Sequence, residues 1–155
     1  MTERVAVLAQ DLIWQDRLAR AVEAAGAEAA RAKTAPEFDL ALVDARRAIV
    51  DMTARAYDPV EAIERASAAG ARVIAVGEHD AIDARKRALG AGAERVFAYR
   101  KLFEDGPATL RRWLGEGDGD RPDAQPRRDV PGNGDGTDAE PRPDVASEVP
   151  AGARR

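Results

Sequence analysis

Residue types on which common protein chemistry depends are absent or rare in this 155-residue chain. It has no cysteine, which excludes disulfides, thiolate nucleophiles and thiolate metal ligands. Its single histidine, His79, argues against a zinc site, because such sites combine several His or Cys ligands. His79 follows Glu78 in a predicted loop and has no nucleophile beside it, so we expect no catalytic role for it and no enzyme activity.

Long apolar runs are also missing. The first residues, "MTERVAVLAQD", contain acids and no apolar run long enough for a signal peptide or a membrane-spanning helix. We therefore expect a cytoplasmic protein that does not enter a membrane.

Large apolar side chains are absent from the last quarter of the chain. From Gly115 onward there is no Leu, Ile, Met, Phe, Tyr or Trp, so little burial can offset the entropy cost of ordering that backbone. The sequence predicts one folded domain over residues 1–114 and a disordered tail over residues 115–155, rich in Gly, Pro, Asp and Arg.

The folded part has no excess of either charge. Of the 24 basic and 28 acidic residues, 6 and 10 lie after Gly115, which leaves 18 of each before it. The densest basic cluster, "ARKRA" at residues 84–88, is typical of a solvated helix face. This balance gives no electrostatic reason to expect nucleic-acid binding.

Several short signals mark where helices begin and end. Gly26, Gly70 and Gly92 each follow an Ala-rich segment and precede a strand-like run, and Gly is favoured just after a helix because it accepts positive φ. Two segments, "TAPE" from Thr34 and "DPVE" from Asp58, predict capping boxes with Pro in the first turn.

Three further helix features can be predicted. Asp80 is expected to cap a helix that runs to residue 91, and "DGP" at residues 105–107 is expected to start the last helix. In the first helix, Trp14 lies on one apolar stripe with Leu18 and Val22, so we expect Trp14 in the core.

Four runs are short and almost entirely apolar: residues 5–9, 48–52, 72–76 and 95–99. Continuous apolar residues are typical of strands that are covered on both faces, as in a parallel sheet. The weaker run at residues 28–32 would be an edge strand. Five strands alternating with five helices predict a doubly wound α/β fold, a flavodoxin-like three-layer sandwich with a five-stranded parallel sheet.

The end of the third strand is ambiguous, because "FDLALVD" ending at Asp44 resembles a strand as much as "AIVD" ending at Asp51 does. Parallel neighbours need a crossover of roughly a dozen residues, usually a helix. A strand ending at Asp44 would leave too few residues for that crossover, so we place the strand end at Asp51 and a helix over residues 36–45.

Ligands of open α/β sheets bind beyond the carboxyl ends of the strands. The residues predicted at that rim are Gln10, Asp11, Asp51, Gly77, Glu78, His79, Tyr99, Arg100 and Lys101.

Across roughly residues 5–114 the chain resembles the receiver domains of bacterial response regulators. The resemblance lies in the five-fold strand–helix order, in "AGAERV" before the last strand, and in acids after the first and third strands. It is more similar still to degenerate receivers, in which an Asp-Leu pair opens the first helix and a "VD…DP-x-E-A-I" segment follows the third strand. Here these segments are "QDLIW" and "VDMTARAYDPVEAI".

The resemblance implies a partial phosphorylation site. Asp51 matches the phosphoryl acceptor and Asp11 one of two acids that hold Mg²⁺, while Gln10 replaces the other acid. Gly77 replaces a Ser or Thr and Tyr99 replaces a Lys, with Arg100 and Lys101 one and two positions later.

Each matched acid also has a plain structural interpretation. Asp51 would be a solvated carboxylate where the chain leaves the sheet, and Asp11 would cap the first helix. Mg²⁺ can be held by one or two carboxylates with phosphate oxygens, so Asp11 and Asp51 still meet the minimum, and we predict no cofactor except weakly bound Mg²⁺. Arg100 and Lys101 are within reach of Asp51, but surface solvation is the simpler expectation.

Three functions are compatible with these residues. The leading hypothesis is a pseudo-receiver, a signalling or scaffolding module that contacts another protein, or a second copy of itself, without a phosphate switch. By resemblance its contact face would include Arg85, Arg95, Phe103 and Trp113, each of which is equally compatible with plain surface or core. The second is a relaxed phosphoacceptor that uses Asp51 and Mg²⁺. The third, least favoured, is a binder of FMN, cobalamin or a nucleotide, because no phosphate-binding or cobalamin motif is present.

Overall fold

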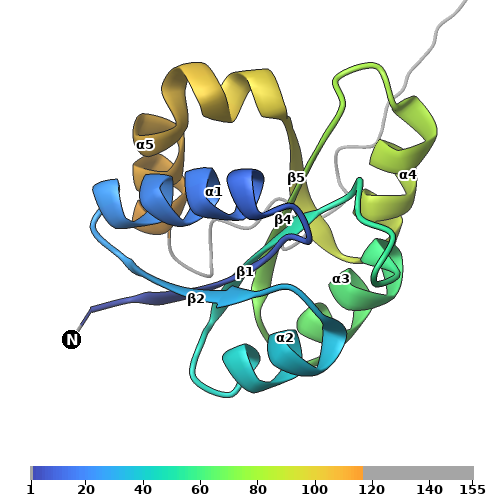
Figure 1. The fold of residues 1–155 in the computed structure, drawn as a ribbon, viewed down its shortest axis with the longest axis horizontal. Helices are drawn as coiled ribbons and strands as arrows, with labels where there is room; N and C mark the ends of the chain where they lie inside the picture. Colours follow the sequence, from blue (N-terminus) through green and yellow to red (C-terminus); the bar gives the residue numbers. More distant parts are fainter. Residues whose placement is uncertain (1, 117–155) are drawn as a thin grey trace, which may run out of the picture. The chain divides into compact units, whose positions relative to one another are not determined.

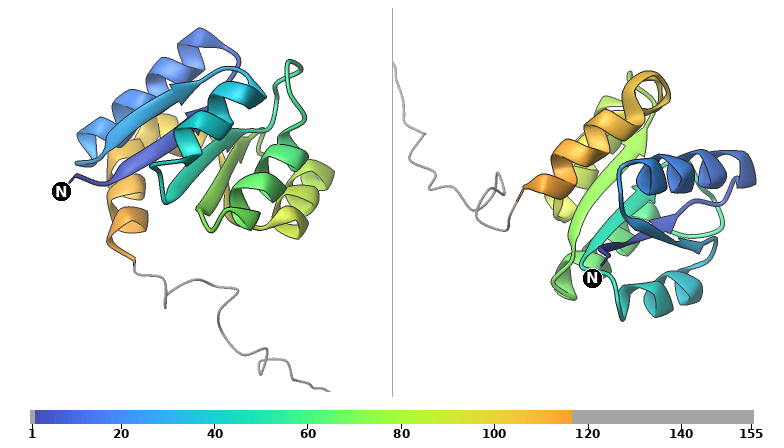
Figure 2. Two further views of the ribbon diagram at one scale, coloured as in Figure 1. Left: turned by 90° about the horizontal axis from the view of Figure 1, so that it is seen from below. Right: turned by 90° about the vertical axis from the view of Figure 1, so that its left-hand side faces the viewer.

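The computed structural model describes residues 2–116 as a five-stranded parallel sheet with helices on both faces (Figures 1 and 2). The strand order is β2-β1-β3-β4-β5, and every neighbouring pair is parallel. The strands are β1 (Arg4–Leu8), β2 (Glu28–Ala32), β3 (Arg47–Asp51), β4 (Arg72–Gly77) and β5 (Ala93–Ala98). The predicted fold class is confirmed, including the edge strand at β2.

Five helices connect and follow the strands: α1 (Leu12–Ala24), α2 (Ala35–Leu42), α3 (Pro59–Ala68), α4 (Ile82–Ala91) and α5 (Tyr99–Gly115). Helices α1 and α5 cover one face of the sheet, and α2, α3 and α4 cover the other (Figures 1 and 2). Within residues 2–116, no helix is both long enough and apolar enough to cross a bilayer.

Alternate residues of each strand enter different halves of the core. In β1, Val5 and Val7 pack with α1 and α5, whereas Ala6 and Leu8 pack with the helices of the opposite face. All four side chains are completely buried. This double burial explains why the strands have continuous apolar sequences instead of alternating ones.

The predicted end of β3 is confirmed, since β3 ends at Asp51 and α2 forms the crossover before it. Asp44 lies in the loop between them, exposed and paired with Arg4, so the alternative strand was wrong. The three glycines after α1, α3 and α4 all have positive φ, from 91° to 122°. At Gly92 a Cβ would also come within 2.6 Å of the Ser67 hydroxyl oxygen.

Most predicted caps are present. Asp11, Thr34 and Asp58 each accept backbone N–H bonds at the starts of α1, α2 and α3. The cap predicted at Asp80 was wrong, because α4 begins after Ala81 and has no side-chain cap bond.

The last helix begins earlier than predicted. It starts at Tyr99, directly after β5, and is interrupted at Asp105, whose dihedral angles (φ −145°, ψ 33°) are not helical. The "DGP" segment therefore marks a break within α5 and the start of its second part. Figure 1 shows the two parts, yellow and orange, running in different directions.

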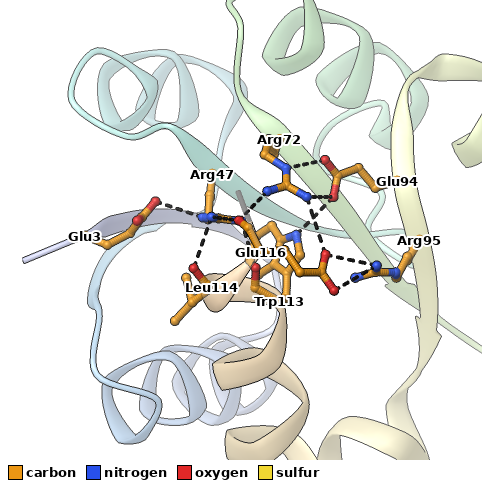
Figure 3. Close-up of polar contacts among 8 residues, drawn as sticks. All are labelled: Glu3, Arg47, Arg72, Glu94, Arg95, Trp113, Leu114 and Glu116. Carbon is orange, nitrogen blue, oxygen red and sulfur yellow. Dashed lines mark hydrogen bonds and ion pairs between the residues drawn. The ribbon is translucent and has the colours of Figure 1, made fainter. Parts of the chain in front are cut away.

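Two buried arginines hold the C-terminal end of α5 (Figure 3). Arg47 and Arg72 begin β3 and β4 and are direct neighbours in the sheet. Arg47 donates to the carbonyl oxygens of Trp113 (3.0 Å), Leu114 (3.2 Å) and Glu116 (2.7 Å), and Arg72 also donates to the Glu116 carbonyl (2.7 Å). These bonds satisfy carbonyls that a helix end leaves without partners.

Acidic side chains neutralise this arginine pair. Glu94 accepts two bonds from Arg72, and the side chains of this pair are only 1% and 2% exposed. Glu3 pairs with Arg47 at 2.9 Å, and Glu116 pairs with Arg95 at 3.0 Å. Glu116 belongs to the segment predicted as a tail; residues 117–155 of that segment lie outside the described residues.

Replacing Arg72 with Met should lower the free energy of unfolding by about 3–5 kcal/mol, because the Glu94 carboxylate would stay buried without its cation. Urea unfolding followed by far-UV circular dichroism measures this loss. The matched control is Arg4→Met, which breaks the exposed pairs of Arg4 with Glu28 and Asp44 and should cost far less than Arg72→Met, because solvent screens surface ion pairs. Equal losses in both variants would contradict the assignment.

Candidate functional site

An open cleft of about 660 Å³ lies at the carboxyl ends of the strands, lined by the loops that follow β1, β3, β4 and β5. The predicted rim residues that line it are Gln10, Asp11, Asp51, Gly77, Glu78, His79, Tyr99 and Arg100. Trp14, Thr53, Ala54, Arg55 and Ala98 complete the lining. The sheet topology therefore brings nearly the whole predicted rim to one site.

Asp51 is buried at the floor of this cleft, with 1% of its surface exposed. Its Oδ1 accepts hydrogen bonds from the Thr53 backbone N–H (3.0 Å), the Thr53 hydroxyl (2.9 Å) and the Tyr99 hydroxyl. The interpretation of Asp51 as a solvated carboxylate was wrong. At the end of β3 the Asp51 carboxylate is surrounded by hydroxyl and N–H donors. Their hydrogen bonds compensate for the water that the carboxylate has lost on burial.

Tyr99 occupies the position of the expected lysine and directs its hydroxyl to Asp51. The same hydroxyl lies 2.7 Å from the Thr53 hydroxyl oxygen, so three polar groups form one compact cluster. Burial, followed by the hydrogen bond to Asp51, raises the pKa of Tyr99 above its ordinary value. Tyr99 therefore remains a neutral donor over the physiological pH range.

Trp14 lies against Tyr99 at the wall of the cleft, with ring centroids 4.1 Å apart and ring planes 28° from parallel. The prediction that Trp14 belongs to the core was wrong, because it is half-buried and lines the cleft. Helix α1 extends to the rim, so its first apolar stripe residue reaches the β5–α5 junction instead of the sheet.

Gln10 binds the loop after β3. Its Oε1 accepts from the backbone N–H groups of Arg55 (2.7 Å) and Ala56 (2.9 Å). The same loop is held by Tyr57, whose hydroxyl donates to the carbonyl oxygens of Asp51 (2.9 Å) and Leu8 (3.2 Å). Burial raises the pKa of Tyr57 above its ordinary value.

The candidate magnesium ligands are engaged elsewhere. Asp11 caps α1 through Oδ1, which accepts from the N–H groups of Ile13 (2.9 Å) and Trp14 (3.0 Å). Gln10 Oε1 and Asp51 Oδ1 accept the bonds described above. Within residues 2–116, no group of three or more His, Asp or Glu side chains could hold a metal ion. A Mg²⁺ ion would therefore have to be held through the remaining carboxylate oxygens of Asp11 and Asp51 together with oxygens from outside the chain.

The remaining rim residues do not complete a phosphate site. Arg100 pairs with Glu104 at 2.9 Å and Lys101 with Asp105 at 3.6 Å, so both cations are engaged along α5. A Cβ at Gly77 would meet Met52 at an ordinary distance of 3.4 Å, so the backbone would accept a Ser or Thr there.

Of the four residues of the predicted contact face, Trp113 is buried and was wrongly included, while Arg85 and Phe103 are exposed. Trp113 is 1% exposed and belongs to the core, and Phe103 lies on the α1 side, where the Arg17 guanidinium sits 4.5 Å from its ring centroid. Arg95 pairs with Glu116, and Arg85 donates to the Val96 carbonyl of β5.

Thr53, Trp14 and Tyr57 were not recognised as site residues from the sequence. One signal was available for Thr53, because an Asp commonly accepts a hydrogen bond from the backbone two residues later. The contributions of Trp14 and Tyr57 depend on contacts between distant segments and have no local signal.

Comparisons with known proteins support the fold. No protein-family model and no curated protein matches the chain, whereas solved receiver domains do. The beryllofluoride-activated receiver domain of DrrB from Thermotoga maritima has a TM-score of 0.66 at 16% identity over 75% of this chain and 100% of that one. A CheY-like receiver domain protein from Methanospirillum hungatei has a TM-score of 0.60 at 22% identity, covering 76% and 100%.

A third match is the signal receiver domain of a DNA-binding response regulator from Colwellia psychrerythraea, with a TM-score of 0.63 at 19% identity, covering 74% of this chain and 99% of that one. At these identities the likeness establishes a receiver-like fold for the chain.

The raised pKa values of the two tyrosines predict a loss of stability at alkaline pH. Above pH 10, the ordinary tyrosine pKa, the unfolded chain loses protons that the folded chain keeps, so the free energy of unfolding falls as pH rises. Urea unfolding at pH 7 to 11 measures this slope, and absorbance at 295 nm reports tyrosinate. Tyrosinate in the folded protein near pH 10 would contradict the burial of both hydroxyls.

Replacing Tyr99 with Phe should lower the free energy of unfolding at pH 7 by about 1.5–3 kcal/mol, the usual worth of a hydrogen bond to a charged group. The variant should also show a shallower decline above pH 10, because one of the two shifted groups is gone. An unchanged slope together with unchanged stability would mean that the Tyr99–Asp51 bond is not formed.

Proposed function

We propose that this chain is a receiver-like signalling or scaffolding module that acts through protein contacts and is not switched by phosphorylation. The observation that carries the proposal is the state of Asp51, whose Oδ1 already accepts three hydrogen bonds from within the chain. The hydrogen-bonding capacity of this oxygen is thereby used by groups of the chain itself.

The electrostatics favour the same conclusion. Phosphorylation adds nearly two negative charges and strong acceptor oxygens, which require a cation or several donors nearby. Tyr99 offers a neutral hydroxyl where a lysine would supply a positive charge. Gln10 is neutral and holds the loop after β3, and Asp11 is engaged as a helix cap.

One observation favours the alternative, a relaxed phosphoacceptor. Asp51 Oδ2 accepts no hydrogen bond from the residues of the described range, and the Arg55 and Arg100 side chains line the same cleft. An arginine that turned toward Asp51 could compensate part of an added phosphoryl charge. This alternative needs Oδ2 to be reachable for a phosphodonor.

Incubation with acetyl phosphate and Mg²⁺, followed by intact-mass spectrometry, separates the two functions. We expect no phosphoryl adduct on the wild-type chain and no chemical-shift change at Asp51 with beryllofluoride and Mg²⁺. An adduct that disappears in the Asp51→Asn variant would establish the phosphoacceptor and overturn the proposal.

A matched gain-of-function variant shows that the assay can detect an adduct. Gln10→Asp, Gly77→Thr and Tyr99→Lys together supply the second acid, the hydroxyl and the amine. This triple variant should respond to beryllofluoride and Mg²⁺ when the wild type does not. The partner protein itself can be sought by pull-down with the full chain and with a chain that ends at residue 117, because Glu116 is needed to anchor α5.

A further inference from the structure

Helix α5 consists of two parts that are held by different contacts. The break at Asp105 separates residues 99–104, here called the bridging segment, from residues 106–115, the anchored segment. Gly106 and Pro107 follow the break; Pro fits the first turn of a new helix because its missing N–H is not needed there. The bridging segment can therefore move when its contacts change while the anchored segment keeps its position.

The anchored segment is fixed by many contacts. Leu110 and Trp113 are buried against the sheet, the Trp113 indole N–H donates to Glu94 at 3.2 Å, and Arg47 and Arg72 bind its last carbonyls (Figure 3). Removing any one contact leaves the others in place.

The bridging segment depends on few contacts. Leu102 is buried. The other contacts that hold the segment to the rest of the domain include the hydrogen bond from Tyr99 to Asp51, the stacking of Tyr99 on Trp14, and the contact of the Arg17 guanidinium with the Phe103 ring. Its ion pairs, Arg100–Glu104 and Lys101–Asp105, run along the same helix, are exposed, and contribute little.

The bridging segment also separates two cavities. Tyr99 and Arg100 line the cleft over Asp51, while Leu102 and Phe103 line an apolar groove of about 340 Å³ between α1 and α5. Trp14 lines both cavities. Arg17 links the two rings, since its guanidinium lies 5.7 Å from the Trp14 centroid and 4.5 Å from that of Phe103.

We propose that residues 99–104 form a hinged strap, latched by the Tyr99–Asp51 hydrogen bond, whose release reshapes the α1–α5 groove. Any group in the cleft that takes the place of the Tyr99 hydroxyl on Asp51 frees the strap, which then turns about Asp105 while the anchored segment stays in place. The Asp51 cleft and the groove are coupled because one short segment forms a wall of each. The device does not depend on whether Asp51 can be phosphorylated.

The two tryptophans provide a built-in comparison for the test, since Trp14 reports the strap and Trp113 the anchored segment. In the full chain, Tyr99→Phe should shift the Trp14 indole N–H resonance and raise amide hydrogen exchange in residues 99–104 by about tenfold or more, as expected for the loss of a hydrogen bond to a carboxylate. The Trp113 resonance and exchange in residues 106–115 should not change.

Tyr57→Phe is the matched control, because it also removes a buried hydroxyl bound to Asp51, but at the Asp51 backbone carbonyl. In this variant, amide hydrogen exchange should not rise more in residues 99–104 than in residues 106–115. If Tyr99→Phe does not fold, Trp14→Leu loosens the strap by removing the stacked ring, and it should give the same local rise in exchange. Exchange that rises equally in both parts of α5, or in neither, would overturn the proposal.

Discussion

Strand β3 begins with a buried arginine and ends with a buried aspartate, and both find partners in α5. A buried charge destabilises a fold unless hydrogen bonds or opposite charges replace its water. Arg47 is satisfied by the last carbonyls of α5 and by Glu3, and Asp51 by Thr53 and by the first residue of α5. The position of α5 therefore follows from the two ends of one central strand.

The need of the buried Asp51 for hydrogen-bond donors also determines which groups surround the candidate site. A receiver-like sheet places an acid where several loops meet, and what surrounds that acid decides its chemistry. In this chain the groups that donate to the acid are neutral: the Tyr99 hydroxyl, the Thr53 hydroxyl and the Thr53 backbone N–H. Neutral donors stabilise a carboxylate that carries one charge, but they compensate the added charge of a phosphoryl group less well than an ammonium would. The tyrosine that stands in place of the lysine, Tyr99, also connects Asp51 to α5 through its hydrogen bond.

The similarity to solved receiver domains concerns the backbone more than the site. Identities of 16–22% accompany TM-scores of 0.60–0.66, because a parallel sheet covered on both faces requires only apolar strands, amphipathic helices and glycines at the junctions. Many sequences meet those requirements. These requirements do not specify which side chains lie at the carboxyl ends of the strands, so chains that share the fold can differ there.

Local patterning in the sequence, together with the length that a crossover needs, was enough to predict five strands alternating with five helices, the end of β3 at Asp51, three helix caps and the glycine junctions. It also placed the rim residues together, since parallel strands end at one edge. The order of the strands in the sheet, the burial of Asp51, the hydrogen bond from Tyr99 to Asp51, the stacking of Trp14 on Tyr99 and the break of α5 at Asp105 became known from the folded chain. Those outcomes depend on contacts between residues 48 to 85 positions apart along the chain, such as Asp51 with Tyr99 and Trp14 with Tyr99. No local pattern encodes such contacts.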